Sequence, residues 1–265
     1  MSKDYKDILY DVANGVVRIT INRPEVYNAF RNQTLEELID ALRRADEERS
    51  ANVMVLAGAG DKAFCTGGDQ KVHYNESGLY GPRGTVGMPI EEMHAALRDL
   101  RKVSIAKVQG FAIGGGNVFA TVCDLTIASE KAQFGQVGPK VGSVDPGWGT
   151  AYLSRVLGEK KAREIWFLCR RYSAAEAEKM GLVNKVVPHD QLDAEVDKWC
   201  DEINQLSPTA LTIAKRSFNA DTEHIRGIGF LGIQTVKHYY QSDESKEGVA
   251  AFNERRKPDF KKFVT

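Results

Sequence analysis

Hydrophobic positions follow two different patterns along this chain. In the first half, short runs of valine, isoleucine and leucine predict buried strands. These strands are expected at 16–21, 53–56, 105–108 and 125–128. Between them, apolar residues at helical spacing predict helices at about 34–48, 89–101 and 116–123, with Asn32 as the cap of the first.

The second half of the chain is mostly helical in its spacing, with one short strand expected at 183–187. The helices predicted there cover 147–157, 159–168, 174–180, 192–205, 208–219 and 225–240. The change of pattern predicts an α/β front half followed by a helical back half.

Two segments rich in glycine and proline interrupt these patterns. The segment 134–149 holds five glycines and two prolines, with Ser143 and Asp145 in its middle. It is either a loop that aims these two groups into a cleft or a turn with a solvated aspartate. The segment 71–89 contains six glycines or prolines and predicts a lid or a disordered flap.

Composition narrows the class of protein. A chain of 265 residues, 42% of them hydrophobic, can bury one large core, alone or with a helical appendage. Its 36 basic and 36 acidic residues balance, so nothing indicates a nucleic-acid partner. No apolar run has transmembrane length and Met1–Tyr10 does not resemble a signal, so we expect no membrane partner. Four separated cysteines indicate reduced thiols in a cytoplasmic protein. The five histidines lack metal-ligand spacing, so we expect no metal site and interpret each as a surface or packing residue.

Two glycine-rich turns, Thr66–Gly68 and Gly114–Gly116, each follow a predicted strand. Two N–H groups in such turns, one of them at a helix start, could hold the oxygen of an enolate or a tetrahedral intermediate. Plain turns and a phosphate cradle are the alternatives, although neither common phosphate-binding pattern is present. Ser143 is not in a G-x-S-x-G elbow, which disfavours a serine-hydrolase triad.

Three motifs resemble a known family. Phe64–Asp69, Gly110–Gly116 with Cys123-Asp124, and Phe134–Gln136 are similar to motifs of the crotonase (enoyl-CoA hydratase/isomerase) superfamily, and the resemblance runs from about Asp7 to Phe263. It implies an α/β fold with a spiral core of ββα units and an acyl-CoA site over residues 1–205. A C-terminal helical trimerisation region would cover 206–265. The resemblance also implies a trimer or a dimer of trimers, and no required cofactor, because CoA is part of the substrate.

The same resemblance implies roles for individual residues. The N–H groups of Gly68 and Gly115 would hold the thioester oxygen. Val118 and Gly138 stand where hydratases of this family have glutamates, so simple hydration is not expected. The CoA groove would be lined by Arg23, Val26, Ala29 and the backbone near Ala63 and Thr66, with Phe252 and Arg255 closing on the nucleotide. Further substrate contacts are expected from Asp69, Gln70, Tyr80, Gln136, Val137, Gly138 and Trp166.

Within the superfamily, the segments 65–71, 134–148 and 160–169 are similar to the ring-closing 1,4-dihydroxy-2-naphthoyl-CoA synthases. That similarity makes Ser143 and Asp145 catalytic and brings Tyr240 from a neighbouring helix or subunit. Some of these synthases hold bicarbonate as a base in the pocket that corresponds to Gln136, Gly138 and Trp166. Bicarbonate is disfavoured here, because Val137 replaces the threonine of that pocket. Leu79 replaces a lid tyrosine, with Tyr80 next to it.

The ring-opening 2-ketocyclohexanecarboxyl-CoA hydrolases of benzoate degradation resemble the chain more closely, at 84–94, 115–118, 135–139, 142–147, 207–211 and 214–219. The implied reaction is hydrolysis of a cyclic β-ketoacyl-CoA. Asp145 would activate water, Ser143 would orient it, and Tyr240 would move a proton. We expect burial to raise the pKa of Asp145, and we expect the space beside Gly138 to admit water. A non-catalytic acyl-CoA-binding protein of this fold is the third alternative.

Overall fold

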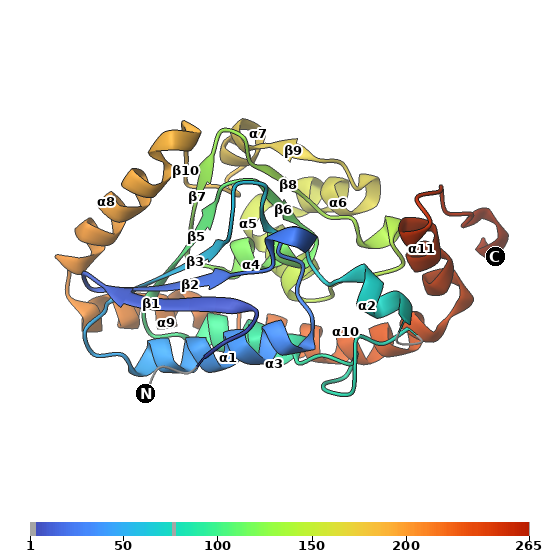
Figure 1. The fold of residues 1–265 in the computed structure, drawn as a ribbon, viewed down its shortest axis with the longest axis horizontal. Coiled ribbons are helices and arrows are strands. Elements are labelled where there is room, and N and C mark those ends of the chain that lie inside the picture. Colours follow the sequence, from blue (N-terminus) through green and yellow to red (C-terminus); the bar gives the residue numbers. More distant parts are fainter. Residues whose placement is uncertain (1–3, 76–77, 265) are drawn as a thin grey trace.

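The computed structural model describes residues 4–75 and 78–264, whose strands form two sheets (Figure 1). The larger sheet has the order β1-β2-β3-β5-β7-β10 and is parallel except for the β1–β2 pair. Its strands are β1 (Ile8–Ala13), β2 (Val16–Ile21), β3 (Val53–Gly58), β5 (Val103–Val108), β7 (Leu125–Ser129) and β10 (Lys185–Val187). The smaller sheet has the order β4-β6-β8-β9, formed by β4 (Ala63–Cys65), β6 (Phe111–Ile113), β8 (Gln133–Gly135) and β9 (Tyr172–Ser173).

The chain alternates between the two sheets. β3, β5 and β7 lie next to one another in the large sheet, and each is followed by a three-residue strand, β4, β6 or β8, in the small one. Helices follow these strand pairs: α2 (Gln70–Asn75) and α3 (Ile90–Asp99) after the first, and α4 (Gly115–Val122) after the second. This is the expected spiral of ββα units. Each short strand therefore ends in a turn on the same side of the molecule, which brings turns that are distant in sequence together.

Two apolar clusters hold the layers together. The larger one lies between the sheets and α1 (Asn32–Glu47), α3 and α4, and includes the fully buried Phe64, Phe119 and Phe134. The second covers the other face of the large sheet, where Val196 and Cys200 of α8 (Leu192–Asn204) pack on the strands. Figure 1 shows α8 along that outer face. The central strand β3 is apolar and buried along its whole length, as expected of a parallel strand between two layers.

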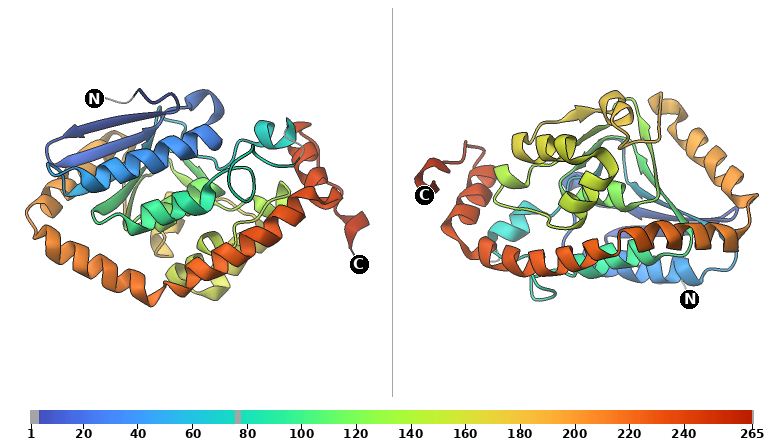
Figure 2. Two further views of the ribbon diagram at one scale, coloured as in Figure 1. Left: turned by 90° about the horizontal axis from the view of Figure 1, so that it is seen from below. Right: turned by 180° about the vertical axis from the view of Figure 1, so that it is seen from behind.

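The remaining helices complete the back half of the chain. They are α5 (Leu153–Leu157), α6 (Glu159–Leu168), α7 (Ala174–Lys179), α9 (Pro208–Asp221), α10 (His224–Gln241) and α11 (Asp243–Asn253). Figure 2 shows α9 and α10 running along one side of the body, with α11 and the C-terminus beyond its edge. Ser207 and Ser242 cap α9 and α11 by accepting hydrogen bonds from backbone N–H groups. Among the described residues, no helix combines the length and the apolar character that crossing a membrane requires.

Most predicted elements are confirmed, with these differences. The N-cap of α1 is Arg31, and Asn32 is already the first helical residue. β1 and α11 were not predicted, nor were the four short strands of the small sheet. The described part of 71–89 is no disordered flap, because α2 begins the segment and Tyr80 is only 3% exposed. The assembly role of 206–265 stays a prediction.

Candidate active site

One large cavity, of about 1880 Å³, collects nearly all of the predicted site residues. Its walls come from the turns after β4, β6 and β8, from α10, and from the segment that follows α11. The predicted residues that line it are Val26, Ala29, Thr66, Gly68, Asp69, Gln70, Tyr80, Gly115, Gln136, Val137, Gly138, Ser143, Asp145, Trp166, Tyr240, Phe252 and Arg255. Residues that are far apart in sequence therefore meet around one space.

Arg23 and Ala63 are absent from this lining and support the wall from behind. Ala63 is fully buried, and its carbonyl accepts hydrogen bonds from the Asn28 and Gln109 amides at 2.7 and 2.8 Å. Arg23 donates to the carbonyl of Ala29 and pairs with Asp69 at 3.1 Å. The polar groups of both residues are engaged inside the protein, and their role in the CoA groove stays a prediction.

The two glycine turns place two N–H groups at the cavity. Phe30 bridges to both neighbours of Gly68, donating to the carbonyl of Gly67 at 2.8 Å and accepting from Asp69 at 2.9 Å. The N–H of Gly68 consequently points away from that bridge. Gly115 is the first residue of α4, where an N–H has no partner within the helix. Across the described residues neither N–H has a recorded acceptor. Two donors are thus free to bind an oxygen anion.

Close packing fixes how near these turns come to each other. A Cβ on Gly67 would lie 3.0 Å from the backbone nitrogen of Gly115, and Gly67 has a φ of 88°. A Cβ on Gly115 would lie 2.7 Å from the Phe30 ring. A Cβ on Gly68 would lie 2.7 Å from the hydroxyl oxygen of Tyr80. The sequence requires glycine at these three positions because the backbones and rings leave no room for a side chain.

Asp145 is the acidic residue of this cavity that is placed to act as an acid or a base. Its Oδ1 accepts a hydrogen bond from the Gly149 N–H at 2.9 Å, and its side chain is 21% exposed. Burial raises the pKa of this carboxyl, as expected. Of the other acidic residues that line the cavity, Asp69 is paired with Arg23 and Glu25 is exposed at the rim. Asp145 is therefore the one placed to exchange a proton inside the cavity.

His94 is the residue of this site that the sequence analysis missed. It was expected to be a surface or packing residue, but its Nε2 lies 3.9 Å from Oδ2 of Asp145. The side chain is buried on the inner face of α3, in line with Ile90 and Leu97. That helical spacing was visible in the sequence and places His94 inward, whereas its partner, far along the chain, could not be identified.

Ser143 and Tyr240 form a second polar pair. Their hydroxyl oxygens are 2.7 Å apart, and burial raises the pKa of Tyr240 above its usual value. Tyr240 comes from α10 of the same chain. The ring of His73 lies against those of Tyr240 and Tyr80, with centroids 4.6 and 4.4 Å away. These rings close the cavity on one side.

Glycines of α10 lie directly against the loop that carries Asp145. A Cβ on Gly232 would lie 2.4 Å from a side-chain carbon of Pro146, and one on Gly147 would lie 2.5 Å from the Cα of Gly229. The helix and the loop therefore touch backbone to backbone at Gly229 and Gly147, and the Pro146 ring packs directly on the helix backbone at Gly232. This contact holds Asp145, which directly precedes Pro146, at a fixed depth relative to Tyr240.

Gly138 lines the cavity, but the direction in which a side chain would point is filled. A Cβ on Gly138 would lie 2.4 Å from the carbonyl oxygen of Ser143 and 3.0 Å from the Trp166 ring. Trp166 donates its indole N–H to the carbonyl of Gly149. In this pocket the Gln136 amide nitrogen is buried and has no acceptor among the described residues.

We predict that activity does not depend on bicarbonate. Val137 offers no hydroxyl, the Trp166 N–H is occupied, and leaving a buried anion short of one hydrogen bond costs about 1–3 kcal/mol or more. Turnover should therefore be unchanged in degassed, bicarbonate-free buffer. A saturable stimulation by added bicarbonate would contradict this expectation and would favour the ring-closing reaction.

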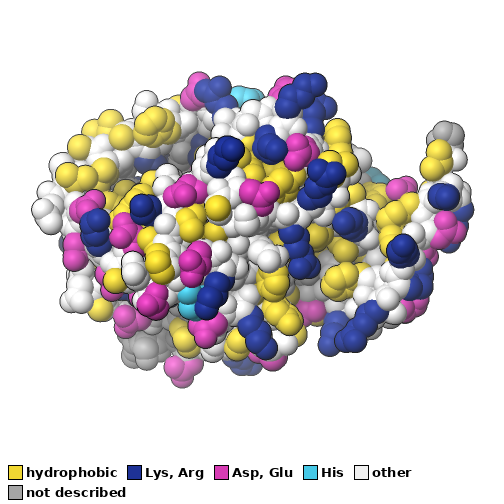
Figure 3. Space-filling model, turned by 90° about the horizontal axis from the view of Figure 1, so that it is seen from above, with side chains coloured by type: hydrophobic (Ala, Val, Ile, Leu, Met, Phe, Trp, Pro, Cys, Tyr) yellow, Lys and Arg dark blue, Asp and Glu magenta, His cyan; other side chains and the backbone are white. Residues whose placement is uncertain are grey.

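The outer part of the cavity is basic and aromatic. Seven lysines and arginines line it against three acidic residues, and Phe252 and Phe167 are 54% and 72% exposed. In the space-filling view, lysine and arginine side chains border the hollow between the body of the molecule and its C-terminal arm (Figure 3). This rim suits a ligand that carries phosphates and an aromatic base.

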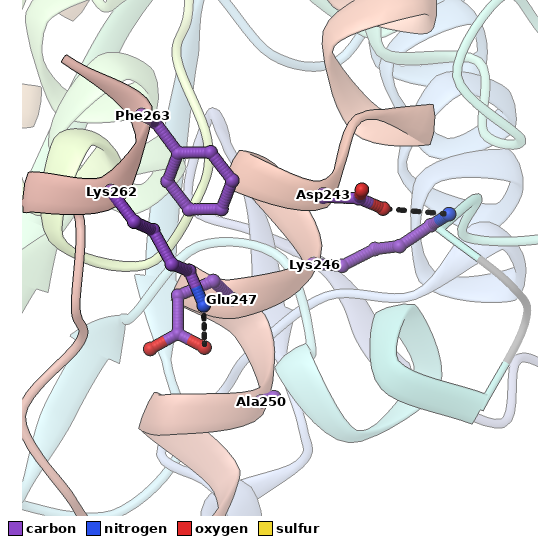
Figure 4. A pocket seen from close by; sticks show the side chains of 6 residues that line it. All are labelled: Asp243, Lys246, Glu247, Ala250, Lys262 and Phe263. Atoms are coloured by element: carbon purple, nitrogen blue, oxygen red, sulfur yellow. Dashed lines mark ion pairs between the residues drawn. The ribbon is translucent and has the colours of Figure 1, made fainter.

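A second, smaller hollow of about 500 Å³ lies on the outside of α11 (Figure 4). Its charged groups pair with one another, Asp243 with Lys246 and Glu247 with Lys262. Because these pairs satisfy its charges, it offers no group to a ligand. No cluster of potential metal ligands occurs in the described part of the chain.

The ββα spiral, the small second sheet and the C-terminal helices, with two free N–H donors at the cavity, define an α/β enzyme of the crotonase fold. A family model described as enoyl-CoA hydratase/isomerase matches residues 11–263, so the chain belongs to the enoyl-CoA hydratase/isomerase (crotonase) family. It is an acyl-CoA enzyme, from a family that generally acts without a cofactor. The expected fold class is confirmed.

Solved structures of this family resemble the chain over nearly its whole length. An enoyl-CoA hydratase from Mycobacterium avium subsp. paratuberculosis K-10 is 28% identical, with a TM-score of 0.85 and coverage of 97% of this chain and 99% of that one. A carnitinyl-CoA hydratase from Mycobacterium avium is 28% identical, with a TM-score of 0.84 and coverage of 97% and 98%. An enoyl-CoA hydratase/isomerase from Pseudoalteromonas atlantica T6c is 28% identical, with a TM-score of 0.86 and coverage of 96% and 100%.

Proposed function

We propose that this enzyme opens the ring of a cyclic β-ketoacyl-CoA by hydrolysis, converting 2-ketocyclohexanecarboxyl-CoA and water to pimeloyl-CoA in aromatic (benzoate) degradation. The observation that carries the proposal is the partly buried carboxylate of Asp145, whose pKa burial raises, in a cavity with two free N–H donors. Val118 and Gly138, which stand where hydratases of the family carry glutamates, have no carboxylate. Simple hydration of an enoyl-CoA therefore lacks its acid and base.

The reaction needs three tasks from the protein. Asp145 takes a proton from water as the water oxygen bonds to the ring ketone carbon. The bond between that carbon and the α-carbon then breaks, and its electron pair becomes a thioester enolate. The N–H groups of Gly68 and Gly115 bind the enolate oxygen. The Ser143–Tyr240 pair donates a hydrogen bond to the ketone oxygen and passes a proton to the α-carbon. The proton that Asp145 took from water replaces it, and the second water proton stays on the new carboxylic acid until that acid ionises in solvent.

The basic rim supports a CoA ester as substrate. Arg255 and Phe252 lie at the outer cavity, where a phosphate and an adenine would be received, and Val26, Ala29 and Thr66 line the way inward. A non-catalytic acyl-CoA-binding protein would have no use for the Asp145 carboxylate, whose burial is unfavourable.

The second candidate is ring closure, the 1,4-dihydroxy-2-naphthoyl-CoA synthase reaction of menaquinone biosynthesis. The Ser143–Tyr240 hydrogen bond of 2.7 Å supports this second candidate, because the same pair could donate and accept protons in a condensation. Both reactions pass through a thioester enolate, so both need the same two N–H donors.

We also propose that the protein acts as a homo-oligomer, a trimer or a dimer of trimers. Large apolar side chains on α9 and α10 support this, since Phe218 is 76% exposed and Leu231 is 72% exposed. Such side chains on two adjacent helices are typical of a surface that another copy covers. Sedimentation equilibrium measures the number of copies, and a monomer at micromolar concentration would refute the proposal.

Labelling in H₂¹⁸O tests the proposed reaction directly. We expect one ¹⁸O in the new distal carboxylate of the product and none in the thioester carbonyl, because a C–C bond breaks and the C–S bond does not. In deuterated water, one deuterium should enter the α-carbon when the enolate is protonated. Mass spectrometry of the intact acyl-CoA product measures both labels.

Two other outcomes are distinguishable in the same assay. Free CoA that appears in step with substrate loss would mean ordinary thioester hydrolysis. No reaction with a panel of cyclic β-ketoacyl-CoAs, together with ring closure of o-succinylbenzoyl-CoA, would mean that the enzyme is the synthase.

A further inference from the structure

We propose that His94 is the positioning residue of Asp145, donating its Nε2–H to the Oδ2 of Asp145 and thereby orienting that carboxylate as a base. This inference rests on the proposed function for the identity of the base. It assigns a role in proton transfer to a helix, α3, that otherwise only covers the core.

The geometry of His94 supports this role first. Nε2 is buried, has no hydrogen-bond partner among the described residues, and faces Oδ2 at 3.9 Å. A buried polar nitrogen without a partner is unfavourable by about 1–3 kcal/mol, so such a group is expected to have a partner in the working state. Catalytic hydrogen bonds in empty sites are often long and shorten when the substrate is bound.

The two oxygens of Asp145 would then have separate partners. Oδ1 accepts from the backbone N–H of Gly149 at 2.9 Å, which fixes one end of the carboxylate. A donor on Oδ2 would fix the other end and leave a lone pair of that oxygen directed at the cavity. Without His94, only the hydrogen bond from Gly149 to Oδ1 restricts rotation of the carboxylate.

Charge around His94 favours the neutral imidazole as this donor. Burial lowers the pKa of His94, while Asp145 acts in the opposite direction. The next buried charged residue along α3 is Arg98, and no carboxylate pairs with it in the described part of the chain. The imidazole packs on Phe119 in a T-shaped arrangement, with ring centroids 5.9 Å apart. A second cation beside Arg98 in this apolar surrounding would be unfavourable.

Arg98 gives α3 a second contact with the loop that carries Asp145. Its guanidinium donates to the Tyr152 hydroxyl at 2.9 Å and to the hydroxyl of Thr222, and lies 5.3 Å from the centroid of the Trp148 ring. Trp148 and Tyr152 bound the π-helical turn that follows Asp145. One face of α3 therefore contacts the loop twice, at Asp145 through His94 and just beyond it through Arg98.

Kinetics of two substitutions separate positioning from packing. His94→Leu removes the donor, and we expect kcat to fall by about 100-fold with KM changed less than about threefold. Because a donor to the ionised carboxylate lowers its pKa, losing it should also move the acid limb of the kcat/KM profile to higher pH. His94→Gln keeps an N–H at a similar reach, and we expect it to recover at least about tenfold of the lost activity.

The matched control is His189→Gln. His189 also lies near an aspartate, with Nε2 3.8 Å from Oδ1 of Asp61, but it lies outside the cavity. Its kinetics should equal those of the wild type. An unshifted acid limb in His94→Leu, or equal losses in the Leu and Gln variants, would overturn the proposal and leave His94 with a packing role.

A measurement without substrate keeps this test separate from the proposed function. In protein labelled with ¹⁵N-histidine, the His94 resonances are identified by their loss in His94→Gln. We expect a neutral ring protonated at Nε2 between pH 6 and 8, with a changed Nε2 shift in Asp145→Asn. A proton at Nδ1 instead, or no change on substitution of Asp145, would refute the donor role even if the enzyme opens no ring. Kinetics are then run on whichever acyl-CoA the wild type converts.

Discussion

Replacing Asp145 by asparagine is expected to lower kcat by about 10³-fold while KM for the acyl-CoA substrate changes less than about threefold. Asparagine has nearly the same shape, and its carbonyl oxygen can still accept the hydrogen bond from Gly149. What it loses is the ability to take a proton from water. Steady-state kinetics and the dissociation constant of an unreactive acyl-CoA, measured by calorimetry, separate the two effects.

Stability measurements provide the control for this variant. Burial raises the pKa of Asp145 in the folded protein, so folded protein binds this proton more tightly than the unfolded chain does. The stabilisation by that proton is present at low pH and is lost as the pH rises through the raised pKa. At pH 7 the variant lacks this unfavourable buried charge, and its Tm should equal or exceed that of the wild type. Near-normal turnover by the folded variant would remove Asp145 from the mechanism.

Replacing Gly115 by alanine is expected to lower kcat by about 10²-fold or more, the loss seen when one oxyanion donor is removed. The new Cβ would lie 2.7 Å from the Phe30 ring and 3.4 Å from the Cα of Gly67. Since Phe30 is packed in the core, the start of α4 has to move, and the Gly115 N–H moves with it. The loss should appear in kcat rather than KM, because the oxygen is an anion only in the transition state and the enolate.

Gly227→Ala is the matched control for this substitution. Gly227 lies in α10, and a Cβ there would have nothing within 4 Å. Alanine in a helix is favoured over glycine by about 0.5–1 kcal/mol, so this variant should be as active as the wild type and at least as stable. A Gly115→Ala protein with wild-type Tm and wild-type kcat would show that this N–H does not bind the enolate oxygen.

The elements that the sequence predicts best are those long enough to show a complete pattern of apolar and polar positions. β2 and α6 begin and end where their apolar patterns do. The strands β4, β6 and β8 have three residues each, too few to show alternation, and they exist because partners elsewhere in the chain hold them. β1 could have been found, since Asn14-Gly15 is a common two-residue hairpin turn, and both residues have positive φ here.

In the site, too, local features could be predicted from the sequence, whereas contacts between distant segments could not. Glycine turns and a lone aspartate are local features, so Gly68, Gly115 and Asp145 could be selected from the sequence. His94 could be placed on an inner helix face but not next to Asp145, because that contact depends on how α3 crosses the loop. The hydrogen bonds that the Ala63 carbonyl accepts inside the wall depend on the three-dimensional packing and could not be predicted, and the CoA contact expected near Ala63 stays a prediction.

The direct contact of α10 with the loop after Asp145 limits how this enzyme can evolve. Most of α10 faces away from the body of this chain, but Gly229 and Gly232 rest on Gly147 and Pro146. Any larger residue at these two positions would push the loop, and with it the base, away from Tyr240. Two helix positions without any chemistry of their own are therefore sterically tied to the position of the base. Changes of substrate range are more accessible through the rim of the cavity than through this helix.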